Sequence, residues 1–187
     1  MDKQQPLHLI NLELEEIIRG CKVNDRCCQK ALYDLYSQKM YGVCIAYMKD
    51  EQLAQDILHD SYFKIFKKID HFKDDARKVE GWIRRIVVNT AIDYLRRDKK
   101  FTASDYIESY QTAGYCDVAQ NTNVNDLTDL INLLPNGART VFNLYSLEGY
   151  KHKEIAEILN ISEGTSKSQF SRAKTILQSL VNQYYLH

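Results

Sequence analysis

A predicted helix near the C-terminus has a polar side suited to nucleic-acid chemistry. It forms the second half of the stretch Glu148–Val181, and the residues concerned are Lys167, Ser168, Ser171, Arg172 and Lys174. Lysine and arginine neutralise phosphates, while hydroxyl and guanidinium groups also bond the edges of bases. An apolar stripe at helical spacing runs along the opposite side, from Phe170 to Leu180. This stripe predicts that the helix packs on a core and leaves its cationic side free.

A tight turn joins this helix to a shorter one, predicted from about Lys151 to Leu159. Asn160 tolerates the left-handed backbone that ends a helix, and Ser162 can cap the following helix by accepting a bond from an amide of its first turn. Two helices of this kind are typical of a DNA-reading helix-turn-helix. The alternative is an ordinary helical hairpin whose charges form a solvated face.

A second cationic stretch, Gly81–Lys100, holds six basic residues against two acidic ones, a net charge of +4. The helix predicted over 81–97 carries polar residues that can bond bases and phosphates: Arg84, Arg85, Asn89, Asp93, Arg96 and Arg97. Trp82 could stack on a base, but it aligns with the apolar face, which favours a place in the core. A solvated face is again the alternative for the arginines.

A third helix, predicted over 51–69, has a crowded polar side with Gln55, Asp56, His59, Asp60 and Tyr62. The apolar period of the same helix also includes Tyr62, so its inward or outward position is open at this point. His59 has no neighbour at metal-ligand spacing. The chain shows no catalytic serine motif, no phosphate-binding glycine loop and no oriented Cys/His couple, so we expect no enzymatic activity and no cofactor.

The composition predicts an all-α protein. The 187 residues are 44% hydrophobic and include only two prolines and seven glycines, and they show no alternating strand pattern. We find neither a secretory signal nor an apolar run of about 20 residues, so we expect a soluble, cytoplasmic protein.

The five cysteines, of which Cys27 and Cys28 are adjacent, match no metal-binding spacing; reduced thiols are favoured, with a metal or redox role as the alternative.

The patterning divides the chain into two small helical domains joined by a flexible acidic linker. The N-terminal bundle, 1–100, contains predicted helices over 9–20, from Asn24 or Asp25 to about Lys49, over 51–69 and over 81–97, with Leu35 among the inward residues of the second. Residues 101–130 carry five acids and no lysine or arginine, a charge of −5, and residues 101–124 are predicted to be the linker. The helix-turn-helix domain occupies 125–187, with a helix of about Gly137 to Leu147 before the DNA-reading pair.

Three ordered segments resemble the extracytoplasmic-function (ECF) sigma factors, small alternative sigma subunits of bacterial RNA polymerase. The core-binding helix of that family is similar to AQDILHDSYFKIFKKIDHF, its −10 helix to GWIRRIVVNTAIDYLRRDKK, and its −35 domain to LPNGARTVFNLYSLEGYKHKEIAEILNISEGTSKSQFSRAKTIL. The resemblance covers about Asn24 to Val181. It departs at His59, where the family commonly has glutamine, and at Ser166, where it often has valine.

The resemblance implies a sigma factor that binds core RNA polymerase and promoter DNA, takes no small-molecule substrate and is monomeric when free. An anti-sigma protein is implied as a further partner. The polymerase-contacting residues would be Gln55, Asp56, His59, Asp60, Tyr62 and Phe66, with the core as the alternative for Phe66. The loop Lys73–Glu80 would capture a base flipped from the −10 element. Two other hypotheses remain at this point: a helix-turn-helix regulator that does not bind core polymerase, and a metal or redox protein.

Overall fold

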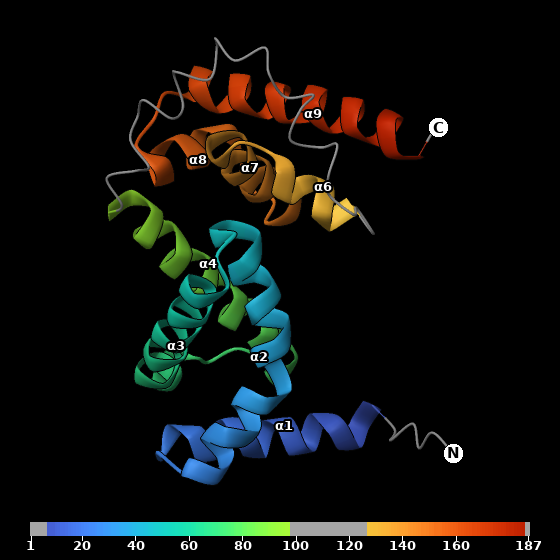
Figure 1. Cartoon of the computed structure of the whole chain (residues 1–187). Helices are drawn as coiled ribbons and strands as arrows, with labels where there is room; N and C mark the ends of the chain where they lie inside the picture. The colour runs from blue at the N-terminus through green and yellow to red at the C-terminus, as the bar shows by residue number, and fades with distance from the viewer. Residues whose placement is uncertain (1–6, 98–126, 186–187) are drawn as a thin grey trace. The chain divides into compact units, whose positions relative to one another are not determined.

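The structure, a computed structural model, describes residues 7–97 and 127–185, and every regular element among them is helical (Figure 1). The predicted all-α class is thereby confirmed. The chain divides into two compact units, Met1–Ala91 and Ile92–His187. The predicted linker, 101–124, lies outside the described residues, as do Asp98, Lys99, Lys100 and Cys116. Among the described helices, none combines the length and the apolar character needed to cross a membrane.

The first unit begins with α1 (Leu7–Lys22) and α2 (Arg26–Met48), and α1 packs across the start of α2 (Figure 1). Asp25 caps α2 by accepting from the amides of Cys27 and Cys28, at 2.7 and 3.1 Å. The prediction that α1 stops at Gly20 is wrong. A Cβ atom at Gly20 would stand 2.2 Å from Cys28 Sγ, so this glycine permits two helices to approach rather than ending one.

Two further helices follow, α3 (Glu51–Lys68) and α4 (Val79–Arg97), with the short 3-10 turns η1 (Ile69–His71) and η2 (Ala76–Lys78) between them, and the boundary between the units falls within α4, after Ala91. Asp50 caps α3 by accepting from the amide of Leu53 at 2.7 Å. The helix α4 starts two residues before the predicted Gly81. Leu35 was predicted to lie inward, but it is 54% exposed. The apolar residues of α2 occupy a wider part of the helix surface than the part that is buried.

The second unit contains α6 (Leu127–Leu133), α7 (Asn136–Phe142), α8 (His152–Leu159) and α9 (Glu163–Tyr185). A π-helical turn, Asn143–Leu147, follows α7, so the continuous helix predicted to Leu147 changes its hydrogen bonding at Asn143. Buried residues of α6, α7 and α9 form one apolar cluster in this unit, namely Leu130, Ile131, Leu134, Ala138, Ala173, Leu177 and Leu180. This cluster fixes the inner side of α9 and leaves its other side available for a ligand.

Candidate nucleic-acid interface

The turn before α9 has the geometry that its residues predict. Asn160 ends α8 in the left-handed region, with φ 55° and ψ 47°. The amide of Ile161 donates to the carbonyl of Ala156 at 3.0 Å. Ser162 Oγ then accepts from the amide of Thr165 at 2.9 Å, which starts α9. Both the predicted helix end and the predicted cap are confirmed, and together they set the angle at which α9 leaves α8.

The five predicted −35 residues all lie outside the buried stripe of α9. Lys167, Ser171 and Lys174 are exposed, while Ser168 and Arg172 are half-buried. Lys167 Nζ lies 2.7 Å from the Glu163 carboxylate, and this bond lowers the pKa of Glu163. Lys174 Nζ lies 5.1 Å from the centre of the Phe170 ring. A cationic surface of this kind can bind phosphates and base edges, so the −35 assignment stays a prediction with a suitable geometry.

Ser166, where the family often has valine, is completely buried. Its hydroxyl oxygen lies 2.9 Å from Nδ1 of His152, the first residue of α8. The His152 ring also stacks on Tyr145, with ring centres 4.5 Å apart, and Tyr145 in turn lies 4.4 Å from Phe170. A polar bond and ring contacts therefore accompany the apolar packing between α8 and α9. The buried hydroxyl does not lack a partner, which explains how serine is accommodated here.

On α4 the predicted −10 residues occupy the less buried side. Arg85, Asn89, Arg96 and Arg97 are exposed, and Arg84 and Asp93 are half-buried. Arg96 Nη1 lies 3.9 Å from the Asp93 carboxylate, one helical turn away. Trp82 is half-buried and lies against Phe72, with ring centres 5.3 Å apart, which supports its predicted place in the core. The cationic face of α4 thus exists over the described residues.

The loop that leads into α4 is held by its own side chains. Asp75 accepts from the backbone amide of Arg77 at 2.9 Å and from its side-chain Nε at 3.0 Å. These bonds hold the pKa of Asp75 well below its usual range. At the start of α4, Lys39 Nζ from α2 lies 3.2 Å from the Glu80 carboxylate. Lys73 and Asp74 come before these anchors and are exposed, and the Asp74 carboxylate lies 3.9 Å from Lys78 Nζ.

The exposed side of α3 carries four of the predicted polymerase contacts: Gln55, Asp56, His59 and Asp60. Phe66 is half-buried and packs on Tyr62, with ring centres 5.9 Å apart. The prediction that Tyr62 belongs to this surface is wrong. Tyr62 is 3% exposed and lies 4.6 Å from the Tyr33 ring of α2, and burial raises the pKa of its phenol. Its alternative placement, inside the bundle, is confirmed.

Phe63 is the residue that sequence reasoning missed on α3. It is 71% exposed, the most exposed of the large apolar side chains on that helix. It follows His59 by four positions and Asp60 by three, so it shares their side of the helix. That spacing was visible in the sequence and could have singled out Phe63 as an apolar residue on a polar face. Gln55, Asp56, His59, Asp60 and Phe63 are called the α3 face below.

The cysteines do not form a site among the described residues. Cys21, Cys27, Cys28 and Cys44 are free thiols, and no group of three or more histidines, cysteines and acids in the described part of the chain could hold a metal ion. Burial raises the pKa of the Cys21 thiol to about 11 and that of Cys44 to about 12. A raised pKa makes the Cys21 and Cys44 thiols poor nucleophiles and poor metal ligands, whereas Cys27 is exposed and Cys28 half-buried.

Comparison with known proteins settles the family. The family profile Sigma-70 region 2 matches residues 32–101, and Sigma-70, region 4 matches residues 125–177. The ECF RNA polymerase sigma factor SigM of Bacillus subtilis (strain 168) is 32% identical over 155 residues, 81% of this chain and 94% of the relative. The chain belongs to the ECF sigma factors of the sigma-70 family. Sigma factors are transcription initiation factors.

Other relatives extend this comparison. The ECF sigma factor SigW of the same strain is 26% identical over 186 residues, 90% of this chain and 97% of the relative. Among solved structures, the sigma factor RpoE in complex with the anti-sigma factor NepR from Bartonella quintana matches with a TM-score of 0.47 and 21% identity. That match covers 82% of this chain and 96% of the solved one. The two matching family profiles and the similarity to SigM favour the sigma-factor hypothesis over a regulator that does not bind core polymerase.

Proposed function

We propose that this ECF sigma factor binds core RNA polymerase through the α3 face and presents α9 to the −35 element and α4 to the −10 element of a promoter. The exposure of Phe63 among four polar side chains is the observation that carries the polymerase assignment. A large exposed apolar side chain beside polar groups suits a protein partner, because its burial contributes binding energy while the neighbouring polar groups give specificity. A regulator that binds only DNA has no use for such a face.

Reversing the charges of Asp56 and Asp60 tests whether the α3 face binds core polymerase. Both carboxylates are exposed on the α3 face, one helical turn apart. Against a basic partner surface, Asp56→Arg with Asp60→Arg replaces attraction by like-charge repulsion, and we expect it to abolish copurification with core polymerase. Phe63→Ala should weaken binding without changing the charge.

The matched control reverses two exposed acids elsewhere in the same unit, Asp34→Arg with Asp70→Arg. It introduces the same change in net charge, and we expect it to leave polymerase binding intact, since exposed ion pairs contribute little to stability. Circular dichroism of all variants checks that the helices persist. Wild-type binding by the Asp56/Asp60 variant, with an unchanged spectrum, would contradict the assignment of this face.

At the −10 element we propose that the loop of residues 73–80 captures a base flipped from the duplex while α4 holds the adjoining duplex and strand. Extruding a base costs a few kcal/mol of stacking and pairing, so a pocket that binds it favours melting at one sequence. Asp93 and Asn89 supply groups that can bond base edges, and the arginines of α4 supply phosphate contacts. In this proposal, the loop and α4 together bind the −10 element and begin the separation of its strands.

The proposal includes the setting in which the protein works. We propose a cytoplasmic monomer without catalytic activity that gains promoter specificity in the holoenzyme and is restrained by an anti-sigma protein that covers the α3 face. The segment of residues 101–130, with its charge of −5, would screen the cationic surfaces of the free protein. Replacing Asp105, Glu108 and Asp117 by asparagine or glutamine should then raise DNA binding by the free protein, measured at fixed salt. An unchanged affinity would leave the segment as a spacer only.

A further inference from the structure

The helix α1 lies before the region that the sigma-70 region 2 profile covers, since that match begins at residue 32. It is nevertheless packed into the first unit, with Leu14, Ile18 and Cys21 buried. It contacts α2 and both short turns, η1 and η2, that flank the proposed base-capturing loop. An element outside the matched region thus supports the segment proposed to read the −10 element.

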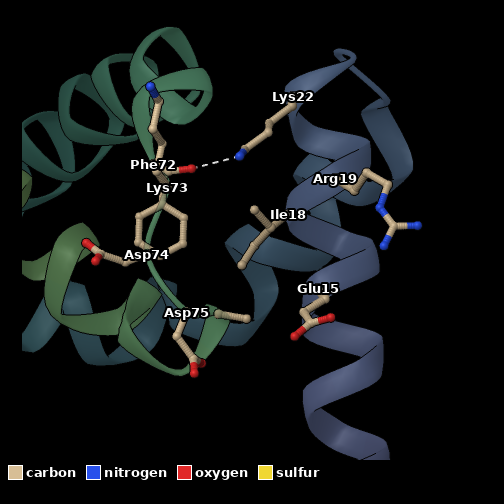
Figure 2. Close-up of a pocket in the computed structure, with 9 residues that line it drawn as sticks. Glu15, Ile18, Arg19, Lys22, Phe72, Lys73, Asp74 and Asp75 are labelled. Atoms are coloured by element: carbon tan, nitrogen blue, oxygen red, sulfur yellow. Dashed lines mark hydrogen bonds between the residues drawn. The ribbon is translucent and has the colours of Figure 1, made fainter.

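Lys22, the last residue of α1, bonds this helix to the start of the loop. Its ammonium donates to the backbone carbonyl of Phe72 at 2.7 Å, across 50 positions of sequence (Figure 2). Phe72 is the residue that leaves η1 and begins the loop. Its ring is 3% exposed and rests against Trp82, so the carbonyl bonded to Lys22 belongs to a residue that is itself anchored in the core.

The far end of the loop is tied down separately. Ala76 is buried, and Asp75 bonds the amide of Arg77 as described above. Only Lys73 and Asp74 lie between the anchors, and a segment so short has little freedom once both ends are held. The position of the loop is therefore set by the bond at Phe72 on one side and by η2 on the other.

Beside the loop the structure leaves a hollow of about 290 Å³. Ile18, Arg19 and Glu15 of α1 form one wall and Lys73, Asp74 and Asp75 the other (Figure 2). Buried apolar residues also line the hollow, Ile18 on the side of α1 and Phe72 and Ala76 on the side of the loop. The charge-assisted bond from Lys22 adds a directional restraint on the Phe72 carbonyl to these apolar contacts.

We propose that Lys22 is a positioning residue for −10 recognition: it holds the loop of residues 73–78 in the conformation that accepts an extruded base. The inference rests on the proposed function of that loop. Lys22 need not touch DNA for this role. Losing its bond allows the loop to sample other positions over the hollow, which lowers discrimination between bases without removing any group that contacts them.

The test compares Lys22→Met, which keeps most of the side-chain length but removes the ammonium, with Lys22→Arg, which keeps a cationic donor. Lys30→Met is the matched control, because Lys30 is an exposed lysine of α2 outside the loop. Each full-length protein is combined with core polymerase and assayed on a promoter library randomised in the −10 element. Backbone amide hydrogen exchange over residues 73–78 of the free proteins reports the loop directly.

We expect Lys22→Met to lose about tenfold in discrimination at one −10 position, the change that corresponds to one charge-assisted hydrogen bond, and to exchange faster in the loop. Lys22→Arg should retain most of the discrimination, and Lys30→Met should match the wild type. Wild-type discrimination by Lys22→Met overturns the inference, whether or not its loop exchanges faster. Absence of any −10 preference in the wild-type holoenzyme is a different result, and it overturns the proposed function instead.

Discussion

The two proposed DNA-reading regions are held in place by different forces. In the second unit, α9 rests on an apolar cluster of seven buried residues and starts from a capped turn. In the first unit, the loop before α4 has buried apolar residues at its two ends, Phe72 and Ala76, and is otherwise held by polar bonds: Lys22 to Phe72 and Asp75 to Arg77, with Lys39 bonded to Glu80 at the start of α4. Apolar packing resists movement in every direction, whereas a polar tether restrains mainly the atoms that it joins.

This difference teaches which kind of change each region tolerates. A helix seated on a core keeps its position when a surface group is lost, so its base-contacting residues can be altered one at a time. A tethered loop can lose its conformation while the bundle beneath it stays folded. We therefore expect core substitutions to act on the −35 region through stability, and polar substitutions to act on the −10 region through specificity.

The largest effect should come from Leu130→Ala. Leu130 is fully buried in the cluster under α9, and removing its side chain leaves a cavity that costs about 2–5 kcal/mol of unfolding free energy. Chemical denaturation should show early loss of the second unit, and binding should weaken at every −35 sequence alike. Leu147→Ala is the control, because Leu147 is 50% exposed and its loss should change stability little. Equal stability of the two variants would contradict the view that apolar packing holds α9 in place.

Arg172 and Lys174 separate base reading from phosphate binding on the same helix. Arg172→Ala should cost about 1–3 kcal/mol and relax preference at one −35 position. Lys174→Ala should weaken binding to all sequences alike. It should also make the logarithm of the binding constant fall less steeply with the logarithm of the salt concentration, by the amount expected for about one lost phosphate contact. Titration of a −35 library with the holoenzyme at several salt concentrations measures both effects. Promoter preference and affinity untouched by Arg172→Ala would show that the recognition surface lies elsewhere.

Asp93→Ala tests the −10 helix in the same way. Asp93 is half-buried on α4 and within one turn of Arg96. We expect the substitution to shift preference across a −10 library more than it changes overall affinity, because a carboxylate that accepts from a base adds specificity but repels phosphates. Wild-type preference in the variant would rule out a base-reading role for Asp93. It would not test the loop before α4, which the Lys22→Met variant tests separately.

The smallest effect should come from Ser166→Val, which restores the residue common in the family. It removes the hydroxyl beside His152 Nδ1 and should destabilise the second unit by about 1 kcal/mol, since the imidazole loses its recorded partner in a half-buried position. His152→Phe combined with Ser166→Val should recover part of that loss. A double-mutant cycle by denaturation measures the coupling, and additive effects would mean that the bond contributes nothing to the position of α9.

The sequence alone determined the local architecture. Helical periodicity, the caps Asp25 and Ser162, and the left-handed Asn160 set where the helices begin and end, because each depends on residues within a few positions. The cationic side of α9 followed from the same periodicity. Gly20 shows the limit of local reasoning: it was taken as a helix stop, whereas its small size serves the contact with Cys28 of the next helix.

Only the tertiary structure decided which side chains on the flank of an apolar stripe are covered. Tyr62 and Phe63 are adjacent aromatic residues with nearly the same local pattern, yet Tyr33 of α2 covers one and leaves the other exposed. The bonds from Lys22 to Phe72 and from His152 to Ser166 likewise join residues 50 and 14 positions apart. The helical period predicts on which side of its own helix a residue lies. Which neighbouring helix covers that side depends on the packing of the whole unit.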